Sequence, residues 1–465
     1  MKVLVTSIKH VAPSLYFGLS MEKSLVGFPF RSSIALSLGD VVEIKDPNDT
    51  MPVLLDKDKE SNFVKELNAL LESSISSKIN SVSKTSDKEI DEIAAKMDAK
   101  LKKAAALFLK KLYYSTPVIV RFHNDVDGAS GCFAIYRAIR DSFSSNIFWQ
   151  MQRGIAYSSV DAQNDILLAN SFESLEKPLL LIVDFGTSQE SNEGLSQIGG
   201  LFDIIWLDHH PIDAGFAGSG LDYYINPWQF GGDSNFTAGL LASLFASTIF
   251  HDSMKDIVEA SLLGDYSKYS KPTKESRELA TILDILTSDT HIAGSASGNL
   301  SPAAIDGVIS NPKKKSELIA YGENRVAELL DNAFLGIKVH KADRANIYIA
   351  DFEKIRGNKE ERYPLPGRFA SRLMDKIEEL NGNEVRAVVV LHFGPFISLR
   401  CSKLLSSENF NLLEIVQKIK EVHGSEIESG GGHFSAASIK LSKEESKKNV
   451  ITDVVEELKK KLSAS

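Results

Sequence analysis

The chain has 465 residues, of which 43% are hydrophobic and 25% are charged, and its formal net charge is −9. This length allows about two to four globular domains. The negative charge argues against a surface coated with basic residues for long duplexes, although it leaves room for a local basic groove.

The two cysteines, Cys132 and Cys401, lie far apart in apolar sequence and are expected to be buried thiols of a reducing cytosol. The N-terminus is broken by Lys9, His10 and Pro13, which makes a poor signal peptide. The longest apolar runs, such as PLLLIVDFG, have the length of strands and not of membrane spans. We therefore expect a cytoplasmic protein.

Residues 1–46 contain short strand-like segments, KVLVTSI, LYFGLS and ALSLGDVVEIK, separated by Gly and Pro. They predict a small β-rich N-terminal module, either a plain structural or docking domain, which we favour, or an OB-like nucleic-acid module. Residues 47–112 are charged and rich in Ser and Lys, and 88–112 carry apolar residues at helical spacing. This region is expected to be a linker with a helix inside it, followed by a helix over 88–112 that leads into the next domain.

Residues 113–313 alternate strand and helix patterns. The runs TPVIVRF, NIFWQMQ, PLLLIVDFG and FDIIWLD are almost continuously apolar. Such strands, separated by helices, predict a parallel sheet that is covered on both faces. In sheets of this kind ligands bind beyond the carboxyl ends of the strands.

Residues 314–344 resemble a connector helix, and a second α/β pattern covers 345–465. Its expected strands are ANIYIADF, VRAVVVLHF, FISLRCS and HFSAASIKL, interleaved with helices and followed by a charged C-terminal helix. The predicted fold class is therefore α/β, with a parallel-sheet domain, a smaller C-terminal α/β domain and the β-rich N-terminal module.

Acids and histidines gather at the ends of four predicted elements in residues 113–313. The segments are RFHNDVDGAS with His123, Asp125 and Asp127; LIVDFGTS with Asp184; WLDHHP with Asp208, His209 and His210; and LLGDYSKY with Asp265, which follows a helix. The alternation in the first segment predicts that its three side chains share one side of an extended chain. Gly128 is expected to allow a tight turn into the next helix.

Carboxylates and imidazoles together are ligands for Mn²⁺ or Mg²⁺. Each segment alone also has a structural explanation, because Asp-x-Asp-Gly is a common turn and an Asp after a strand often caps a helix. Adjacent carboxylates repel, however, so a cluster needs metal or protonation. All four segments together predict a centre in which two metal ions, bridged by one carboxylate, act on a phosphate.

The order of these segments resembles the DHH phosphoesterase superfamily: HNDVDG, VDFG, LDHHP and LLGD match its successive motifs, and FISLRCS and ESGGGHFSAAS resemble its C-terminal domain. The resemblance covers about residues 90–465. It implies that Asp125, with His123, binds one metal, and that Asp127, His209 and Asp265 bind the other. It also implies that Asp184 bridges the metals, that Asp208 orients a histidine, and that His210 meets the substrate phosphate.

In the C-terminal domain the resemblance implies a substrate-binding role for a small set of residues. Arg400 would hold a phosphate, and His433 would contact the terminal nucleotide. The glycines Gly430, Gly431 and Gly432 would let the backbone approach a ligand. The loop departs from the family pattern, since it continues as Ala436, Ala437 and Ser438 where Ala-Ala-Gly is usual, and many bacterial members have an acid in place of His123.

The segments INPWQFGG and FTAGLLAS resemble the archaeal RecJ-like single-strand exonucleases of the GINS-associated nuclease type. This implies an exonuclease for DNA or RNA that uses two Mn²⁺ or Mg²⁺ ions and releases mononucleotides, with GINS-like replication proteins or a helicase as partners. The segment DYSKYSKPTKES, with interleaved Tyr and Lys, is either a nucleic-acid contact or a solvated loop.

Three alternatives stay open. A phosphodiesterase for oligoribonucleotides, nucleotide bisphosphates or cyclic dinucleotides fits the net charge slightly better. An inorganic pyrophosphatase is disfavoured, because those relatives carry a C-terminal domain marked by other Lys and Arg residues. An inactive replication scaffold similar to Cdc45 should have lost metal ligands, and this chain retains them.

Overall fold

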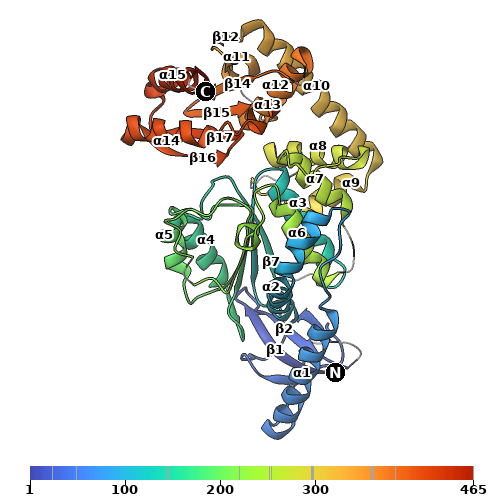
Figure 1. Ribbon diagram of the computed structural model, residues 1–465. Coiled ribbons are helices and arrows are strands. Elements are labelled where there is room, and N and C mark those ends of the chain that lie inside the picture. The colour runs from blue at the N-terminus through green and yellow to red at the C-terminus, as the bar shows by residue number, and fades with distance from the viewer. Residues whose placement is uncertain are drawn as a thin grey trace. The chain divides into compact units, whose positions relative to one another are not determined.

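The computed structural model describes the chain except for residues 23–24, 49, 144–145, 219, 251, 253, 295–297, 358–360, 383 and 464–465, and the side chain of residue 58. The chain divides into two compact units, Met1–Ser310 and Asn311–Ser465 (Figure 1). Both units combine helices with β-sheets, as the α/β prediction requires. Among the described residues, no helix combines the length and apolar character needed to cross a membrane.

A five-stranded parallel sheet forms the centre of the first unit. Its strands are β6 (Val118–His123), β7 (Ile147–Gln152), β9 (Leu179–Val183), β10 (Asp203–Leu207) and β11 (Tyr223–Ile225), in the order β11-β10-β9-β6-β7. Every residue of β9 is buried. This burial explains why the sequence shows an unbroken apolar run there and not an alternating pattern.

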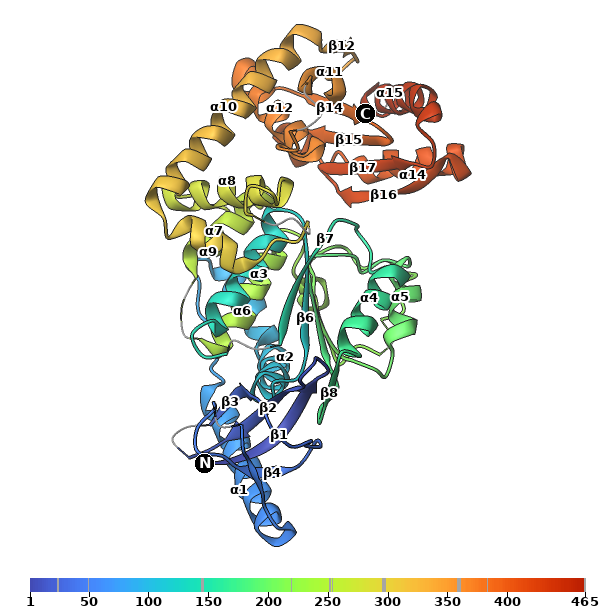
Figure 2. The same ribbon diagram turned by 180° about the vertical axis from the view of Figure 1, so that it is seen from behind.

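Helices cover both faces of this sheet (Figure 2). On one face lie α4 (Ser159–Ala169) and α5 (Ser191–Ile198), packed on a core that includes Tyr157 and Trp206. On the other lie α3 (Val126–Ile139) and α6 (Ala238–Ile249), followed by α7 (Lys255–Gly264), α8 (Lys274–Ser288) and α9 (Pro302–Ile309). The predicted doubly covered parallel sheet is confirmed.

The strand order reverses between β6 and β9. The chain passes from β6 through α3 to β7 on one side, and from β9 through α5 to β10 on the other. A crevice opens at such a point beyond the carboxyl ends of the two central strands, and open α/β sheets bind their ligands there. This topology fixes where the polar residues that follow β6, β9 and β10 must meet.

The N-terminal region forms an antiparallel sheet with the order β3-β2-β1-β4-β5. Its strands are β1 (Lys2–Lys9), β2 (Leu15–Ser20), β3 (Val26–Phe30), β4 (Val41–Glu43) and β5 (Val53–Leu54). A further strand, β8 (Phe172–Ser174), pairs with β1. Residues 1–46 therefore share a sheet with a segment from the region 113–313, where the sequence indicated a separate module.

Two long helices occupy most of residues 47–112, one inside the expected linker and one leading into the next domain. They are α1 (Lys57–Lys78) and α2 (Lys88–Tyr113), and the second begins at the N-cap Asp87, whose side chain accepts hydrogen bonds from the amides of Glu89 and Ile90. The apolar side of α2 is buried, including Ile93 and Leu101. The lead-in helix is confirmed at the expected spacing.

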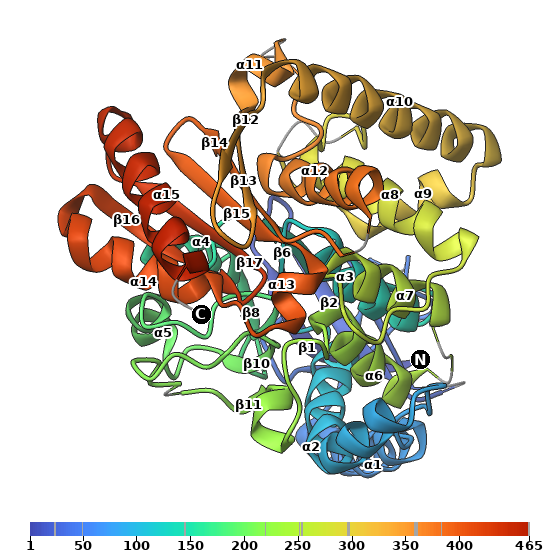
Figure 3. The ribbon, with the colours of Figure 1, turned by 45° about the horizontal axis from the view of Figure 1, so that its top comes forward.

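The second unit contains one mixed sheet between two helical layers (Figure 3). The strand order is β12-β13-β14-β15-β17-β16, from β12 (Lys338–Lys341), β13 (Asn346–Asp351), β14 (Ala387–Phe393), β15 (Phe396–Cys401), β16 (Ile427–His433) and β17 (Ala436–Leu441). Only the pair β13–β14 is parallel among these neighbours.

Each face of this sheet has its own apolar core. One core involves α14 (Leu412–His423) and α15 (Lys447–Ser463), and the other α10 (Pro312–Gly336), α11 (Phe352–Arg356) and α12 (Pro366–Asn381). The short helices α13 (Lys403–Ser407), η2 (Gly424–Glu426) and η3 (Glu444–Ser446) connect these elements. The connector helix expected at 314–344 is α10, and the chain already enters a strand, β12, before residue 344.

Candidate metal centre

Four neighbouring strands of the parallel sheet end at the same level. The register pairs Phe122 with Val183, Val183 with Leu207, and Leu207 with Ile225. The next residues along the chain are His123, Asp184, Asp208 and Asn226. Parallel strands in register therefore bring three of the predicted site segments to one edge of the sheet.

The first site segment is partly helical. His123 ends β6, Asp125 is the N-cap of α3, with Oδ1 accepting from the amide of Gly128 at 2.9 Å, and Asp127 lies in the first helical turn. The predicted alternation along an extended strand is therefore wrong, because the chain turns helical at Val126. The three side chains meet at the site through the strand-to-helix transition.

Gly128 has a different role from the predicted tight turn. It lies inside α3, and a Cβ at this position would lie 2.5 Å from the carbonyl oxygen of His123. Real Cβ contacts are never that short, so only glycine lets the first turn of α3 pack on the end of β6.

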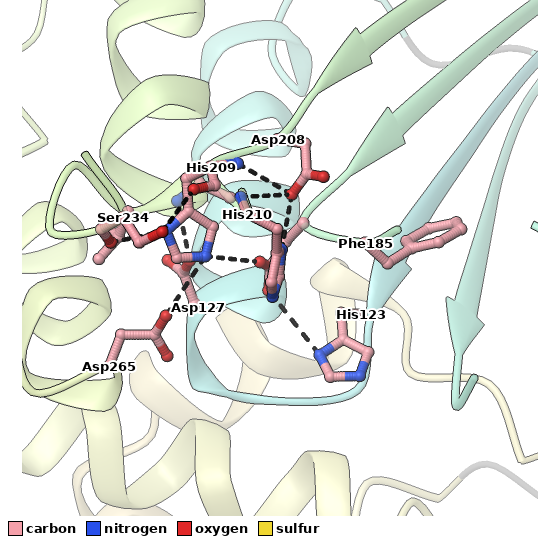
Figure 4. Close-up of polar contacts among 12 residues, drawn as sticks. His123, Asp127, Phe185, Asp208, His209, His210, Ser234 and Asp265 are labelled. Atoms are coloured by element: carbon pink, nitrogen blue, oxygen red, sulfur yellow. Dashed lines mark hydrogen bonds and ion pairs between the residues drawn. The ribbon is translucent and has the colours of Figure 1, made fainter. Parts of the chain in front are cut away.

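His209 is completely buried and faces three acids (Figure 4). Its Nε2 lies 3.5 Å from Oδ2 of Asp127, 3.3 Å from Oδ1 of Asp184 and 3.4 Å from Oδ2 of Asp265. Its Nδ1 lies 2.8 Å from the carbonyl oxygen of Ser234. A carbonyl only accepts, so Nδ1 carries the proton and Nε2 presents its lone pair to the acids, as a metal-binding histidine does.

Asp184 belongs to three groups of possible ligands, each with ligand atoms within 4.8 Å of one another. His123, Asp125 and Asp184 form one, Asp127, Asp184 and His209 form another, and Asp184, Asp208 and His210 form the third. Asp184 is buried, and its Oδ2 accepts no hydrogen bond from any described residue. Its φ of 65° is unusual for a residue other than glycine. Strained backbone with an unsatisfied carboxylate oxygen is typical of a functional position.

Asp127 and Asp184 resist ionisation. Burial, followed by repulsion from Asp265, raises the pKa of Asp127 to about 6, although His209 opposes the shift. Burial, followed by repulsion from Asp125 and Asp127, also raises the pKa of Asp184 well above its ordinary value. A divalent cation relieves this repulsion, and a donor set of carboxylates and imidazoles suits Mn²⁺ or Mg²⁺. The residues present therefore fit a metal centre.

Asp208 acts on His210. Its Oδ1 lies 2.8 Å from Nδ1 of His210, while its Oδ2 accepts from the amide and the hydroxyl of Thr187 at 3.3 and 3.2 Å. Burial favours the neutral acid, but the charge and hydrogen bond of His210 outweigh it and lower the pKa of Asp208. Burial opposes the charge on His210, yet Asp208 raises the pKa of His210 to about 9. This pair fits the predicted orienting role.

Asp127 is held by the first turn of α6. Its carboxylate oxygens accept from the amides of Ala238 at 2.8 Å and Gly239 at 2.7 Å, and from the hydroxyl of Ser261 at 2.5 Å. The positive end of the helix stabilises this buried carboxylate. Ser261 was not among the predicted residues, although the quoted segment FTAGLLAS contains the two amide donors.

The backbone of the two histidines is held by the segment after β11. Asn226 donates from its side-chain amide to the carbonyl oxygen of His210 at 3.0 Å, and Trp228 Nε1 donates to that of His209 at 3.1 Å. The segment INPWQFGG was noted in the sequence, but Asn226 and Trp228 were assigned no role there. The only feature of the sequence that pointed to a role for them is their position after the end of a strand.

Comparison with known proteins gives the fold. No family model matches the chain. The protein MJ1198 of Methanocaldococcus jannaschii, which is uncharacterized, is 24% identical over 407 residues, covering 75% of this chain and 52% of the relative. A solved DHH domain of a member of the s1p family of ribosomal proteins superposes with a TM-score of 0.72 at 20% identity, covering 87% of this chain and 99% of that one.

The chain has the DHH fold. It spans about half the length of the M. jannaschii relative. A weaker likeness, with a TM-score of 0.47 and 14% identity, exists to RecJ of Thermus thermophilus in complex with Mn²⁺, covering 76% of this chain and 54% of that one.

In the C-terminal unit of this DHH fold, Arg400 already makes several contacts. It donates to the hydroxyl of Ser371 at 2.8 Å, to the carbonyl oxygen of Gly367 at 3.0 Å and to that of Leu399 at 2.8 Å. These contacts fix the guanidinium beside the start of α12. Its predicted role in binding phosphate stays a prediction.

The glycine-rich segment is a strand and not the predicted loop. Gly430, Gly431 and Gly432 belong to β16 and pair with β17, and His433 ends the strand opposite Ala436. Gly432 has a φ of 132°, and a Cβ there would lie 2.4 Å from the carbonyl oxygen of Ala436. The glycines thus permit close strand pairing, and their predicted ligand contact stays a prediction.

The aromatic and basic segment after Asp265 is tied to α2. Lys268 pairs with Glu89 at 3.0 Å and Lys271 with Asp87 at 3.2 Å, while Tyr269 is buried. Lys268 also lies 4.8 Å from the ring centroid of Tyr269. These contacts favour the structural alternative for this segment over base stacking.

Proposed function

We propose that this chain is a divalent-metal-dependent phosphodiesterase, and more specifically an exonuclease that releases mononucleotides from single-stranded DNA or RNA. The observation that carries the proposal is the position of Asp184. Its carboxylate joins two ligand groups at the point where the strand order of the sheet reverses. A carboxylate shared by two metals is the basis of hydrolysis at two-metal phosphodiester sites.

In this proposal His123 and Asp125 would hold one Mn²⁺ or Mg²⁺, and Asp127, His209 and Asp265 would hold the other. Asp184 would contribute to both sites. When bound, the two ions supply an activated water and neutralise charge on the phosphate. His210 binds a phosphate oxygen and delivers a proton to the leaving oxygen. Asp208 fixes the ring of His210 and stabilises its protonated form through the 2.8 Å contact.

The choice of a single strand rests on the sequence resemblance of INPWQFGG and FTAGLLAS to RecJ-like exonucleases. Both segments contact residues of the proposed centre: Asn226 donates to the carbonyl oxygen of His210, and the amide of Gly239 donates to Asp127. Partners proposed on the same resemblance are GINS-like replication proteins or a helicase, and the proposed location is the cytoplasm. The net charge of −9 favours one competitor, a phosphodiesterase for short oligonucleotides or cyclic dinucleotides.

The test is a cleavage time course with Mn²⁺ on single-stranded DNA and RNA of about 3 and about 30 nucleotides, labelled at either end. Stepwise shortening of the long strands is expected, and the label released first gives the direction. Asp184→Asn should lower the cleavage rate more than about 100-fold. Mutation of a residue that only supports a metal ligand lowers activity by at most about 100-fold, and Asp184 is proposed as a ligand itself. Asn tolerates a positive φ, so the variant should keep its fold.

Asp213→Asn is the matched control, since Asp213 is an exposed acid close in sequence to the histidines, outside the ligand groups. It should cleave at the rate of the unchanged chain. Rapid cleavage of the trimers with the long strands intact would replace the exonuclease by the small-substrate phosphodiesterase. Binding of Mn²⁺ without any hydrolysis would contradict both and favour a scaffold.

A further inference from the structure

A basic cleft lies within the C-terminal unit, between the strands β12–β14 and the last helix. Its volume is about 360 Å³. Four lysines line it, with one glutamate, Glu456; the lysines are Lys338, Lys447, Lys448 and Lys459. Figure 3 shows α15, which carries three of the lysines, lying along the sheet. None of these residues belongs to the candidate metal centre.

The strand side of the cleft follows from the register. Lys338 pairs with Ile349, and Ile349 pairs with Val390, so these side chains point to one face of the sheet. His392 is two residues beyond Val390 and shares that face. Val390 belongs to the core that α14 and α15 cover, so this face looks toward α15.

The helix side repeats at intervals of four residues. Lys447, Ile451, Val455 and Lys459 form one row along α15. Ile349, Ile451 and Val455 give the cleft an apolar lining, and Lys338 and Lys448 are exposed at it. An apolar lining with a few charged groups is typical of small-molecule sites.

The charges of the cleft are only partly balanced. Lys447 pairs with Glu444 at 2.8 Å and Glu353 at 3.6 Å, and Lys459 pairs with Glu456 at 2.8 Å. Among the residues that the structure describes, neither Lys338 nor Lys448 has an acidic partner. Two lysines at one cleft with no partner of opposite charge make a positive potential that attracts anions.

His392 adds a hydrogen-bonding group. It is partly buried, and its Nδ1 makes no hydrogen bond within the described part of the chain. Burial lowers the pKa of His392, an effect that Lys447 reinforces and Asp351 opposes. A neutral imidazole has one donor and one acceptor, and because His392 lines the cleft its ring can offer a hydrogen bond there.

We propose that this cleft binds the phosphate group of a nucleotide. Lys338 and Lys448 hold the phosphate, His392 donates a hydrogen bond, and the apolar lining packs against the sugar or base. The volume falls within the range of about 300–1,000 Å³ that is ordinary for small-molecule sites. The phosphate belongs either to a free mononucleotide or to the backbone of a strand, and the inference does not depend on hydrolysis at the metal centre.

The test measures binding of N-methylanthraniloyl-labelled AMP to the full chain by fluorescence anisotropy. Excess EDTA keeps divalent ions from contributing a second phosphate site. Lys338→Ala/Lys448→Ala should weaken binding at least about tenfold, equivalent to about 1.4 kcal/mol. The control Lys443→Ala/Lys460→Ala removes two lysines that do not line the cleft. It should bind like the unchanged chain, as should Lys338→Arg/Lys448→Arg and Asp184→Asn.

Competition identifies the source of the phosphate. Stronger displacement by AMP than by an oligothymidine of about ten nucleotides without terminal phosphates supports a free nucleotide, and the reverse order supports a strand. Equal affinity of the cleft and control variants, both with unchanged circular dichroism, would overturn the proposal. Displacement by adenosine as effective as that by AMP would also overturn it, because the phosphate would then contribute nothing.

Discussion

Gly239 shows how a single residue decides whether the acids can meet. A Cβ at this position would lie 2.7 Å from Cβ of Ser261 and 2.8 Å from Oδ1 of Asp127. The amide of Gly239 donates to the same Oδ1 at 2.7 Å. The close approach of α6 to the buried carboxylate therefore requires the smallest residue.

Gly239→Ala should displace Asp127 and weaken Mn²⁺ binding about 10- to 100-fold, the loss expected when a supporting contact to a ligand is broken. Titration calorimetry with Mn²⁺ measures this directly. The free energy of unfolding should also fall by about 1–3 kcal/mol, the cost of overpacking a core.

Gly307→Ala is the control, because it measures how much a Gly-to-Ala change within a helix alters stability when the added methyl group meets no neighbour. Gly307 lies in α9, and its Cβ would meet nothing within 4 Å. That variant should gain about 0.5–1 kcal/mol of stability and bind Mn²⁺ normally. Unchanged Mn²⁺ affinity in Gly239→Ala would contradict the packing argument.

The acids and histidines of the candidate centre could be predicted, because the ends of neighbouring parallel strands bring the next residues of the chain together. The residues that form hydrogen bonds with these acids and histidines could not be predicted. Ser234 orients His209 through a backbone carbonyl, which any residue could supply. Ser261 reaches Asp127 from 134 positions along the chain, and nothing in the local sequence indicates that contact.

At the scale of elements, one histidine links the end of α14 to α15. His423 Nδ1 lies 2.8 Å from Glu426 and its Nε2 lies 2.8 Å from Asp453. Its side chain is only 9% exposed, and burial opposes its charge. The two acids outweigh burial, so the pKa of His423 is raised above its ordinary value.

A raised pKa in the folded state gives stability that is present at low pH and lost as the pH rises through the folded pKa. The C-terminal unit should therefore lose about 0.5–1 kcal/mol of unfolding free energy between about pH 6 and about pH 9, a small value because both acids are partly exposed. In His423→Gln this pH-dependent part should disappear.

Denaturant unfolding at the two pH values measures the effect. Lys420→Gln removes a positive charge from the same last turn without breaking the two contacts, and it should keep the pH dependence. If His423→Gln destabilises the unit equally at both pH values, the two contacts do not carry the charge-dependent stability.

The elements that were predicted correctly have strong apolar patterns, as in β9 or α2, whereas several short strands were missed. The strand β3 contains Gly and Pro and is mostly unburied, and β5 has only two residues, both exposed. The strand β16 contains three glycines in a row. Such strands exist because a neighbour completes their hydrogen bonds, which the local sequence does not encode.

At the scale of the whole chain, each of the two units contains apolar cores of its own. The cores around Val390 and Phe369 are built from residues after 328, and those around Trp206, Val5 and Leu67 from residues before 225. A core that closes within one segment of chain is the mark of a unit that folds by itself.

We therefore expect Met1–Ser310 and Asn311–Ser465 to fold when they are produced separately. Each fragment should unfold cooperatively on heating, and the first should bind Mn²⁺ with the affinity of the full chain, since all proposed ligands lie within it. Circular dichroism and titration calorimetry provide the two readouts. A fragment without a cooperative transition would show that its fold depends on the other unit.

The pairing of β1 with β8 has a consequence for the order of synthesis. The contact of Ser7 with Glu173 spans 166 positions, and β4 covers only the first half of the same edge of β1, at Lys2–Leu4. While a ribosome makes the intervening chain, the second half of that edge stays open, and open strand edges are where nascent chains aggregate. Residues 1–46 transplanted to another protein would carry the same open edge permanently.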